Sequence, residues 1–146
     1  MNIKNSPIEQ ITFQNRSFLI KRDDLLHKDF SGNKARKFFY FLEQDFDGVT
    51  TLISHGSNQS NAMYSLSVLC KLKKWNFIYY TNHLASYLKE NPQGNYKYAL
   101  NNGMDLIVDE NFDKNSLSLD TRTLFIQEGG ALEEASYGLK ILATEI

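Results

Sequence analysis

The sequence predicts an α/β fold with an open, largely parallel sheet flanked by helices. Two observations predict this fold class. Short β-prone runs alternate with segments of helical periodicity over most of the chain. The composition is that of an ordinary globular domain, because 42% of the 146 residues are hydrophobic and 13% are aromatic.

The N-terminal region is predicted to hold a hairpin and a first helix. Residues 11–21 place two β-prone runs around the polar tip Asn15-Arg16. After a charged loop, Ser31-Gly32-Asn33 offers small and capping residues. Apolar residues then recur at helical spacing, at Ala35, Phe38, Phe39 and Leu42. A helix should therefore begin at about Asn33.

The rest of the chain alternates strands and helices. Buried strands are predicted at residues 50–54, 75–80, 105–108 and 123–126. Helices are predicted after the polar turn 55–61, over 87–102 with an interruption at Pro92, and from Leu132 onward. Met63, Leu66 and Cys70, with Ala62 and Leu69, mark the inner face of the first of these three helices.

The apolar stripe of the last predicted helix continues to the final residue of the sequence. The stripe comprises Ala135, Leu139, Leu142 and Ile146. No Gly, Asn or Pro ends the pattern, so apolar surface is expected to lack cover within the chain. We therefore expect a piece of something longer, or one half of an interface such as that of a homo-oligomer.

Charge and cysteine content exclude several classes of partner. Sixteen basic and seventeen acidic residues leave a net charge of −1, which provides no field for nucleic acid or an anionic membrane. No apolar run approaches the ~20 residues that cross a bilayer. The single cysteine, Cys70, and the absence of a charged-then-apolar leader predict a reducing, cytoplasmic location.

Lys34 is a candidate nucleophile. A lysine in the first turn of a helix sits at the positive end of the helix dipole, which favours the neutral amine by a few tenths of a kcal/mol up to ~1 kcal/mol. Imine formation with an aldehyde requires that neutral amine. A surface lysine without chemistry is the alternative, and from these residues alone it is the more common case. A phosphate loop of the Walker type is excluded because its spacing is absent and Ala35 follows the lysine.

Two polar turns follow predicted strands. In 56–61, small and amide residues before a helix leave free N–H groups that suit a carboxylate, with Ser60 and Asn61 beside the ligand. A capped loop without a ligand explains this segment equally well. Residues 127–130, Gln-Glu-Gly-Gly, lie where open α/β sheets bind ligands, although an ordinary turn remains the simpler explanation.

These segments, in this order, resemble the 1-aminocyclopropane-1-carboxylate (ACC) deaminase and D-cysteine desulfhydrase family. The residues that carry the resemblance are Ser6-Pro7-Ile8-Glu9, Lys21-Arg22-Asp23-Asp24-Leu25, Gly32-Asn33-Lys34-Ala35-Arg36-Lys37, Gln59-Ser60-Asn61 and Glu128-Gly129-Gly130. The resemblance implies a tryptophan synthase beta-like fold that binds pyridoxal 5'-phosphate (PLP). It implies that Lys34 carries PLP covalently and that Ser60 and Asn61 contact substrate and cofactor.

The resemblance also implies roles for neighbouring residues. Lys34 and Ser60 would be the catalytic residues, and Lys34, Asn61 and Lys37 would bind the cofactor. Lys37, one helical turn after Lys34, could reach the phosphate. Gln59, Ser60, Asn61 and Ala62 would bind the substrate, whose carboxylate would rest on the N–H groups at residues 60–62.

The resemblance covers nearly the whole chain but only an N-terminal portion of the family's fold. It divides the chain into a hairpin and lysine helix (about 1–45), a small α/β domain (about 46–122) and the start of a return to the large domain (about 123–146). The phosphate-binding glycine loop of the family lies beyond such a segment. Some motif positions also differ, including Ser31, Ser57-Asn58 and Ala62-Met63-Tyr64, which leaves the substrate open.

Three functions are compatible with this sequence. The first is a PLP-dependent lyase or deaminase that converts a small amino acid, such as ACC or a D-cysteine-like compound, into an oxo-acid and ammonia. The second is an inactive truncated fragment or a partner-dependent module without the phosphate loop. The third is a binding domain that holds a small carboxylate at residues 57–61 without covalent chemistry.

Overall fold

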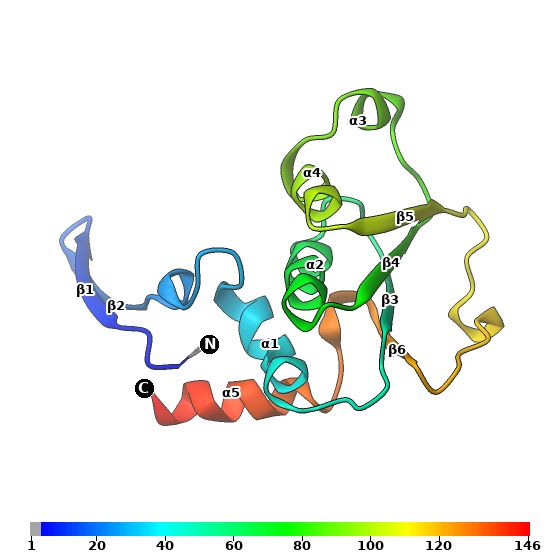
Figure 1. The fold of residues 1–146 in the computed structure, drawn as a ribbon. Helices are drawn as coiled ribbons and strands as arrows, with labels where there is room; N and C mark the ends of the chain where they lie inside the picture. The colour runs from blue at the N-terminus through cyan, green and yellow to red at the C-terminus, as the bar shows by residue number, and fades with distance from the viewer. Residues whose placement is uncertain (1–3) are drawn as a thin grey trace.

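A computed structural model describes residues 4–146. Residues 1–3, assigned above to the hairpin-and-helix region, lie outside the described residues. The main elements are β1 (Ile8–Phe13), β2 (Arg16–Lys21), α1 (Gly32–Glu43), β3 (Thr51–His55), α2 (Asn61–Lys73), β4 (Asn76–Thr81), α3 (Ser86–Glu90), α4 (Gly94–Asn101), β5 (Met104–Val108), β6 (Thr123–Ile126) and α5 (Ala135–Thr144) (Figure 1). Short 3-10 turns lie at Asp23–Leu25, Lys114–Ser116 and Glu128–Gly130.

The central sheet is parallel, as the alternation of strands and helices predicts. Its strand order is β5-β4-β3-β6. Leu52 of β3 is paired with Phe77 of β4 on one side and with Leu124 of β6 on the other. The predicted strand positions are correct to within one residue at each end, because short buried β-prone runs between polar turns have few alternatives.

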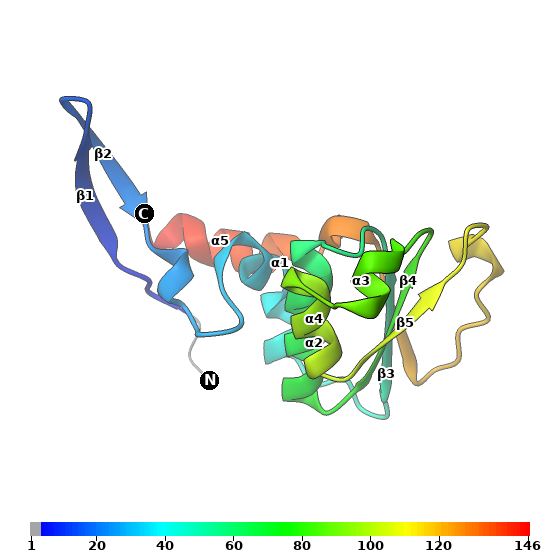
Figure 2. The same cartoon turned by 90° about the horizontal axis from the view of Figure 1, so that it is seen from above.

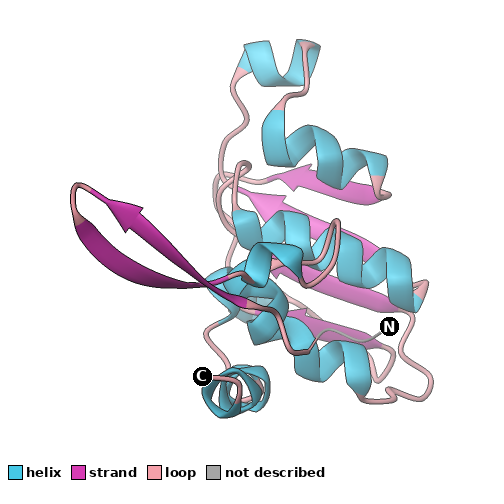
Figure 3. Ribbon diagram, turned by 90° about the vertical axis from the view of Figure 1, so that its left-hand side faces the viewer, coloured by secondary structure: helices cyan, strands magenta, loops and turns pink. Residues whose placement is uncertain are grey.

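The helices cover one face of this sheet. Helices α2 and α4 lie against it, and α1 packs on the outer side of α2 (Figure 1). The view from above shows the same layers, with the segment between β5 and β6 beyond the sheet (Figure 2). In Figure 3 the helices lie in front of the strands, and the β1–β2 hairpin projects away from them. Within residues 4–146, no helix combines the length and apolarity that a bilayer crossing requires.

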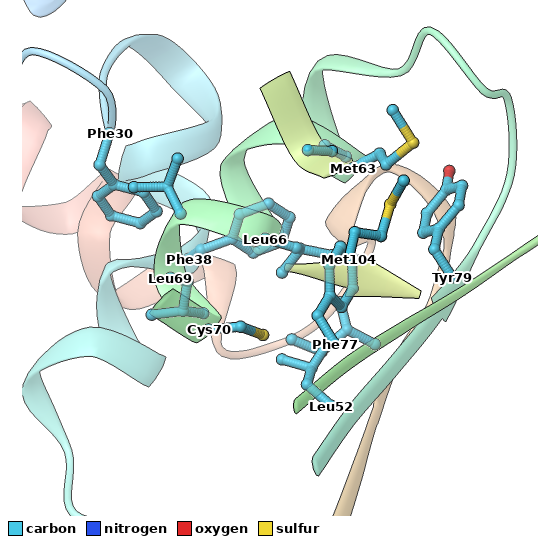
Figure 4. Close-up of a cluster of buried hydrophobic side chains, with 14 of the residues drawn as sticks. Phe30, Phe38, Leu52, Met63, Leu66, Leu69, Cys70, Phe77, Tyr79 and Met104 are labelled. Atoms are coloured by element: carbon cyan, nitrogen blue, oxygen red, sulfur yellow. The ribbon is translucent and has the colours of Figure 1, made fainter. Parts of the chain in front are cut away.

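The hydrophobic core lies between the sheet and α2. Leu66, Leu69 and Cys70 of α2 are fully or almost fully buried; Leu66 and Cys70 lie toward Leu52 and Phe77 of the sheet, and Leu69 points toward α1 (Figure 4). The expected inner face of this helix is therefore confirmed. Pro92 also interrupts the third helical segment as expected, since α3 ends at Glu90 and α4 begins at Gly94.

Part of the predicted apolar stripe of the last helix is exposed, as expected, and the helix packs mainly through small residues. Helix α5 packs on α1 through Ala135 and Gly138, whereas Leu139 is 41% and Ile146 is 79% exposed. A Cβ atom on Gly138 would lie 1.9 Å from the carbonyl oxygen of Arg36. The two backbones can approach closely only where the residues at the crossing are small. Gly138 therefore marks the contact face, although a search for apolar side chains does not detect it.

Candidate functional site

Lys34 is the third residue of α1, and its amine is directed at the turn that follows β6. Its Nζ atom donates a hydrogen bond to the Gly129 carbonyl at 2.9 Å. Burial, and then the neighbouring charge of Lys37, lower the pKa of Lys34 below its ordinary value. The pKa of Lys34 is therefore shifted in the expected direction, and the causes are desolvation and the nearby Lys37 cation.

Lys34 and Asn61 line the same cavity, which has a volume of about 290 Å³. The lysine comes from the start of α1 and the asparagine from the start of α2, so two elements far apart in sequence meet there. The remaining wall residues are Asp29, Ser31, Gly32, Asn33, Tyr64, Ser65 and Asn95. No layer of the sheet separates the amine from the polar turn 56–61.

Ser60 is the N-cap of α2. Its hydroxyl accepts hydrogen bonds from the N–H groups of Ala62 (3.1 Å) and Met63 (3.4 Å). Its own N–H donates to the Ser57 carbonyl at 3.1 Å. Two of the three N–H groups proposed for the substrate carboxylate, those of Ser60 and Ala62, are therefore already satisfied, and the N–H of Asn61 lies between them.

The start of α4 holds the residues before α2. The Gln59 side chain donates from Nε2 to the Gln93 carbonyl at 3.1 Å, so its amide is directed at α4. Asn95 donates from Nδ2 to the Gln59 carbonyl at 3.0 Å and to Oδ1 of Asn61 at 2.8 Å. Sequence reasoning did not identify Asn95, whose only local signal is the turn-forming pair Gly94-Asn95 after Pro92.

Lys37 shares a hydrogen-bond acceptor with Lys34. Its Nζ atom lies 3.4 Å from the same Gly129 carbonyl. Lys37 does not line the cavity of Lys34 and Asn61, however, and faces a separate groove beside Gly130 and α5. The two amines therefore flank one carbonyl from two sides.

Tyr79 is a buried polar residue behind the 56–61 turn, also unforeseen from the sequence. It is 1% exposed, and its hydroxyl donates to the Ser57 carbonyl at 3.2 Å (Figure 4). Burial raises the pKa of Tyr79, the Ser60 hydroxyl acts in the opposite direction, and the Glu128 charge adds to the increase. A Cβ atom on Gly56 would lie 2.8 Å from the Tyr79 hydroxyl and 2.7 Å from Glu128 Oε1, so only glycine fits between them.

A second cavity, of about 640 Å³, opens on the other side of this turn. His55, Asn58, His83, Lys114 and Glu128 are among the residues that line it. It lies beyond the carboxyl ends of β3, β4 and β6, the usual ligand position in open α/β sheets. Residues 55–58 and Glu128, from the two polar turns singled out in the sequence, thus meet at one edge of the sheet.

Comparison with known proteins supports this fold. An ACC deaminase homologue of known crystal structure superposes with a TM-score of 0.79 at 24% sequence identity, over 100% of this chain and 49% of that one. A hydrogen sulfide-producing enzyme from Fusobacterium nucleatum superposes with a TM-score of 0.52 at 12% identity, over 99% of this chain and 41% of that one. No protein-family model and no curated protein matches the sequence.

The two solved structures are longer than this chain. The chain spans about half the length of the ACC deaminase homologue and less of the second enzyme. At these identities the likeness concerns the fold. The chain therefore has the fold of part of an ACC deaminase-like protein, with a parallel four-stranded sheet and the lysine-bearing helix α1 beside it.

Proposed function

We propose that this chain binds PLP through Lys34 and provides the lysine-bearing part of a PLP-dependent lyase or deaminase for small amino acids. The observation that carries the proposal is the cavity in which the amine of Lys34, with its lowered pKa, lies beside Asn61. The likeness in fold to an ACC deaminase homologue and to a hydrogen sulfide-producing enzyme supports this choice of reaction class.

The residues at this cavity fit the aldehyde end of PLP. Imine formation requires an unprotonated amine that is accessible to a ligand, and the only hydrogen bond of the Lys34 amine among residues 4–146 is to the Gly129 carbonyl. Bound PLP would supply the electron sink that stabilises negative charge on the substrate carbon. Lys34 would then act as the general base that moves a proton, and the N–H of Asn61 would bind the substrate carboxylate.

The phosphate end of PLP has fewer candidates in this chain. Lys37 is the nearby cation, but its amine faces the groove next to the cavity. A second candidate function follows from this geometry, in which the chain is a module that binds PLP tightly only with a further polypeptide. The coverage of 49% and 41% of the two solved structures favours this possibility. The choice between an ACC-like and a D-cysteine-like substrate stays open in both cases.

Borohydride trapping tests the assignment of Lys34. PLP is added to the purified chain, the mixture is reduced, and the modified lysine is identified by peptide mass spectrometry. We expect one PLP group at Lys34, complete loss of labelling there in Lys34→Ala, and retained labelling in the control Lys97→Ala, an exposed lysine of α4. A dominant adduct on a different lysine would refute the proposal.

Turnover assays separate the two functions. Release of pyruvate, oxobutyrate or sulfide by the chain alone would establish an independent enzyme. Labelling at Lys34 with weak PLP binding and no turnover would support the partner-dependent module. Binding of small carboxylates with no labelling at any lysine would instead support a non-covalent binding domain.

A further inference from the structure

We propose that Asn95 is a positioning residue that fixes the side-chain amide of Asn61 with its NH₂ group free to donate to a ligand oxygen in the Lys34 cavity. The proposal rests on the proposed function for the identity of that ligand, a ring oxygen of PLP. The orientation of the amide itself follows from the hydrogen bonds of the chain alone.

The orientation of the Asn95 amide is determined by a backbone carbonyl. A carbonyl oxygen can only accept, and the Gln59 carbonyl lies 3.0 Å from one terminal atom of the Asn95 side chain. That atom must be the donor Nδ2. The usual ambiguity between the oxygen and nitrogen of an asparagine side chain is therefore removed at this position.

The orientation of the Asn61 amide follows from that of Asn95. The same Nδ2 atom of Asn95 lies 2.8 Å from the Asn61 side chain, so the Asn61 atom that faces it must be the acceptor Oδ1. The NH₂ group of Asn61 is thereby directed away from Asn95. Neither of its protons is used in a hydrogen bond among residues 4–146. A free N–H donor at the wall of this cavity, which Lys34 and Asp29 also line, suits an oxygen acceptor of a ligand.

The start of α4 is built to keep Asn95 in this place. Gln59 donates from Nε2 to the Gln93 carbonyl at 3.1 Å, which ties the turn to α4 a second time. Gly94 has a φ of 57°, and a Cβ atom there would lie 2.7 Å from Gln59 Oε1. This left-handed φ favours glycine, which also leaves space for the Gln59 side chain. The framework holds Asn95 and Asn61 as a unit.

Nuclear magnetic resonance of the chain without any ligand tests the orientation. In the wild type we expect the side-chain NH₂ protons of Asn95 to exchange with water at least about tenfold more slowly than those of the exposed Asn101, because Asn95 donates two hydrogen bonds. The NH₂ protons of Asn61 should exchange nearly as fast as those of Asn101. Slow exchange at Asn61 with fast exchange at Asn95 would overturn the proposal, even if PLP binds.

Asn95→Asp tests the consequence for the ligand. An aspartate offers only acceptors, so Asn61 should rotate its NH₂ group toward residue 95 and present its carbonyl to the cavity. Without the donor, the proton affinity of a ring oxygen of PLP rises. We expect the pH midpoint of the absorption change of bound PLP to increase by about one unit or more. The matched control Asn101→Asp, which adds the same charge at the other end of α4, should leave the midpoint unchanged.

Asn95→Ala gives a second, uncharged variant that removes both hydrogen bonds. The midpoint should move in the same direction by a smaller amount, since Asn61 is then free to adopt either orientation. A residue with only a structural role would lower the unfolding midpoint in both variants and leave the absorption midpoint at the wild-type value, and that result would overturn the proposal. Failure of the borohydride labelling at Lys34 would count against the proposed function alone, because the exchange experiment needs no cofactor.

Discussion

Arg36 is the most unusual single residue of this chain, because its charged side chain is fully buried. Its guanidinium bonds to Asp23 at 2.8 Å and to Glu145 at 2.7 Å. Lys21 adds a second cation at 2.8 Å from Glu145, whose side chain is only 5% exposed. A buried arginine is tolerated when its donors are satisfied in this way, and the removal of one partner leaves an uncompensated charge.

The stability of the protein should depend on acid through Glu145. The hydrogen bond from Arg36 lowers the pKa of Glu145 from 4.5 to about 2, against an opposing effect of burial. A lowered folded-state pKa means that this stabilisation is fully present above about pH 4.5 and is lost as the pH falls toward 2. The shift corresponds to about 3 kcal/mol of unfolding free energy.

Glu145→Gln should therefore reduce the unfolding free energy at pH 7 by about 3 kcal/mol and flatten its decrease between pH 4.5 and 2. Urea unfolding at a series of pH values measures both effects. Glu133→Gln, an exposed position before α5, is the control and should keep the wild-type profile. An unchanged acid profile in Glu145→Gln would show that Glu145 is not the titrating group.

At the scale of elements, the crossing of α1 and α5 depends on one glycine. Helix α1 packs on α5 more extensively than on any other element. Gly138 lies at the point of contact, where an added Cβ would approach Arg36 and its carbonyl oxygen to 1.9 Å. The crossing also orients α1, and with it the amine of Lys34.

Gly138→Ala should destabilise the protein although alanine is the better helix former. The gain in helix propensity is about 1 kcal/mol, whereas separation of the two helices costs about 3 kcal/mol or more. Thermal unfolding should show the net loss. Ser136→Ala, at an exposed position in the same helix, should be neutral or slightly stabilising. An equal response of the two variants would mean that the helices separate without cost.

At the scale of the whole molecule, the β1–β2 hairpin exposes large apolar side chains, most of them on one face. Cross-strand pairing places Ile11 opposite Phe18 and Glu9 opposite Ile20, so these residues and Phe13 point to the same side. Their apolar side chains are between 37% and 62% exposed. The other face carries the polar residues Gln10, Thr12 and Ser17 together with the exposed Ile8 (43%) and Leu19 (74%), so apolar side chains are exposed on both faces.

The face that carries Phe13 and Phe18 should bind a hydrophobic dye in the native protein. We expect the double substitution Phe13→Ser and Phe18→Ser to lower the fluorescence of bound anilinonaphthalene sulfonate severalfold without lowering the unfolding midpoint, because the side chains removed are exposed. Gln10→Ala on the opposite face is the control. Unchanged fluorescence in the double variant would place the dye site elsewhere.

The amino-acid sequence alone suffices to predict the order and type of the elements and the α/β class. Periodicity and turn residues are local signals, so the four parallel strands and the break at Pro92 were predicted close to their observed positions. The hairpin was also predicted, but it begins at Ile8 instead of residue 11, and Arg16 belongs to β2 and not to the tip. Lys34, Ser60 and Asn61 are also identified from the sequence, because they lie in polar segments next to apolar runs that build the core.

Which of these residues share a cavity, and which contacts hold them there, depends on the packing of elements that are distant in sequence. The contacts of Asn95 with Asn61, and of Arg36 with Glu145, join positions 34 and 109 residues apart. The helix crossing at Gly138 leaves no hydrophobic signal, since its defining feature is the absence of a side chain. Such relations depend on how elements pack in space, and local residue preferences carry no information about the distance between two atoms from different elements.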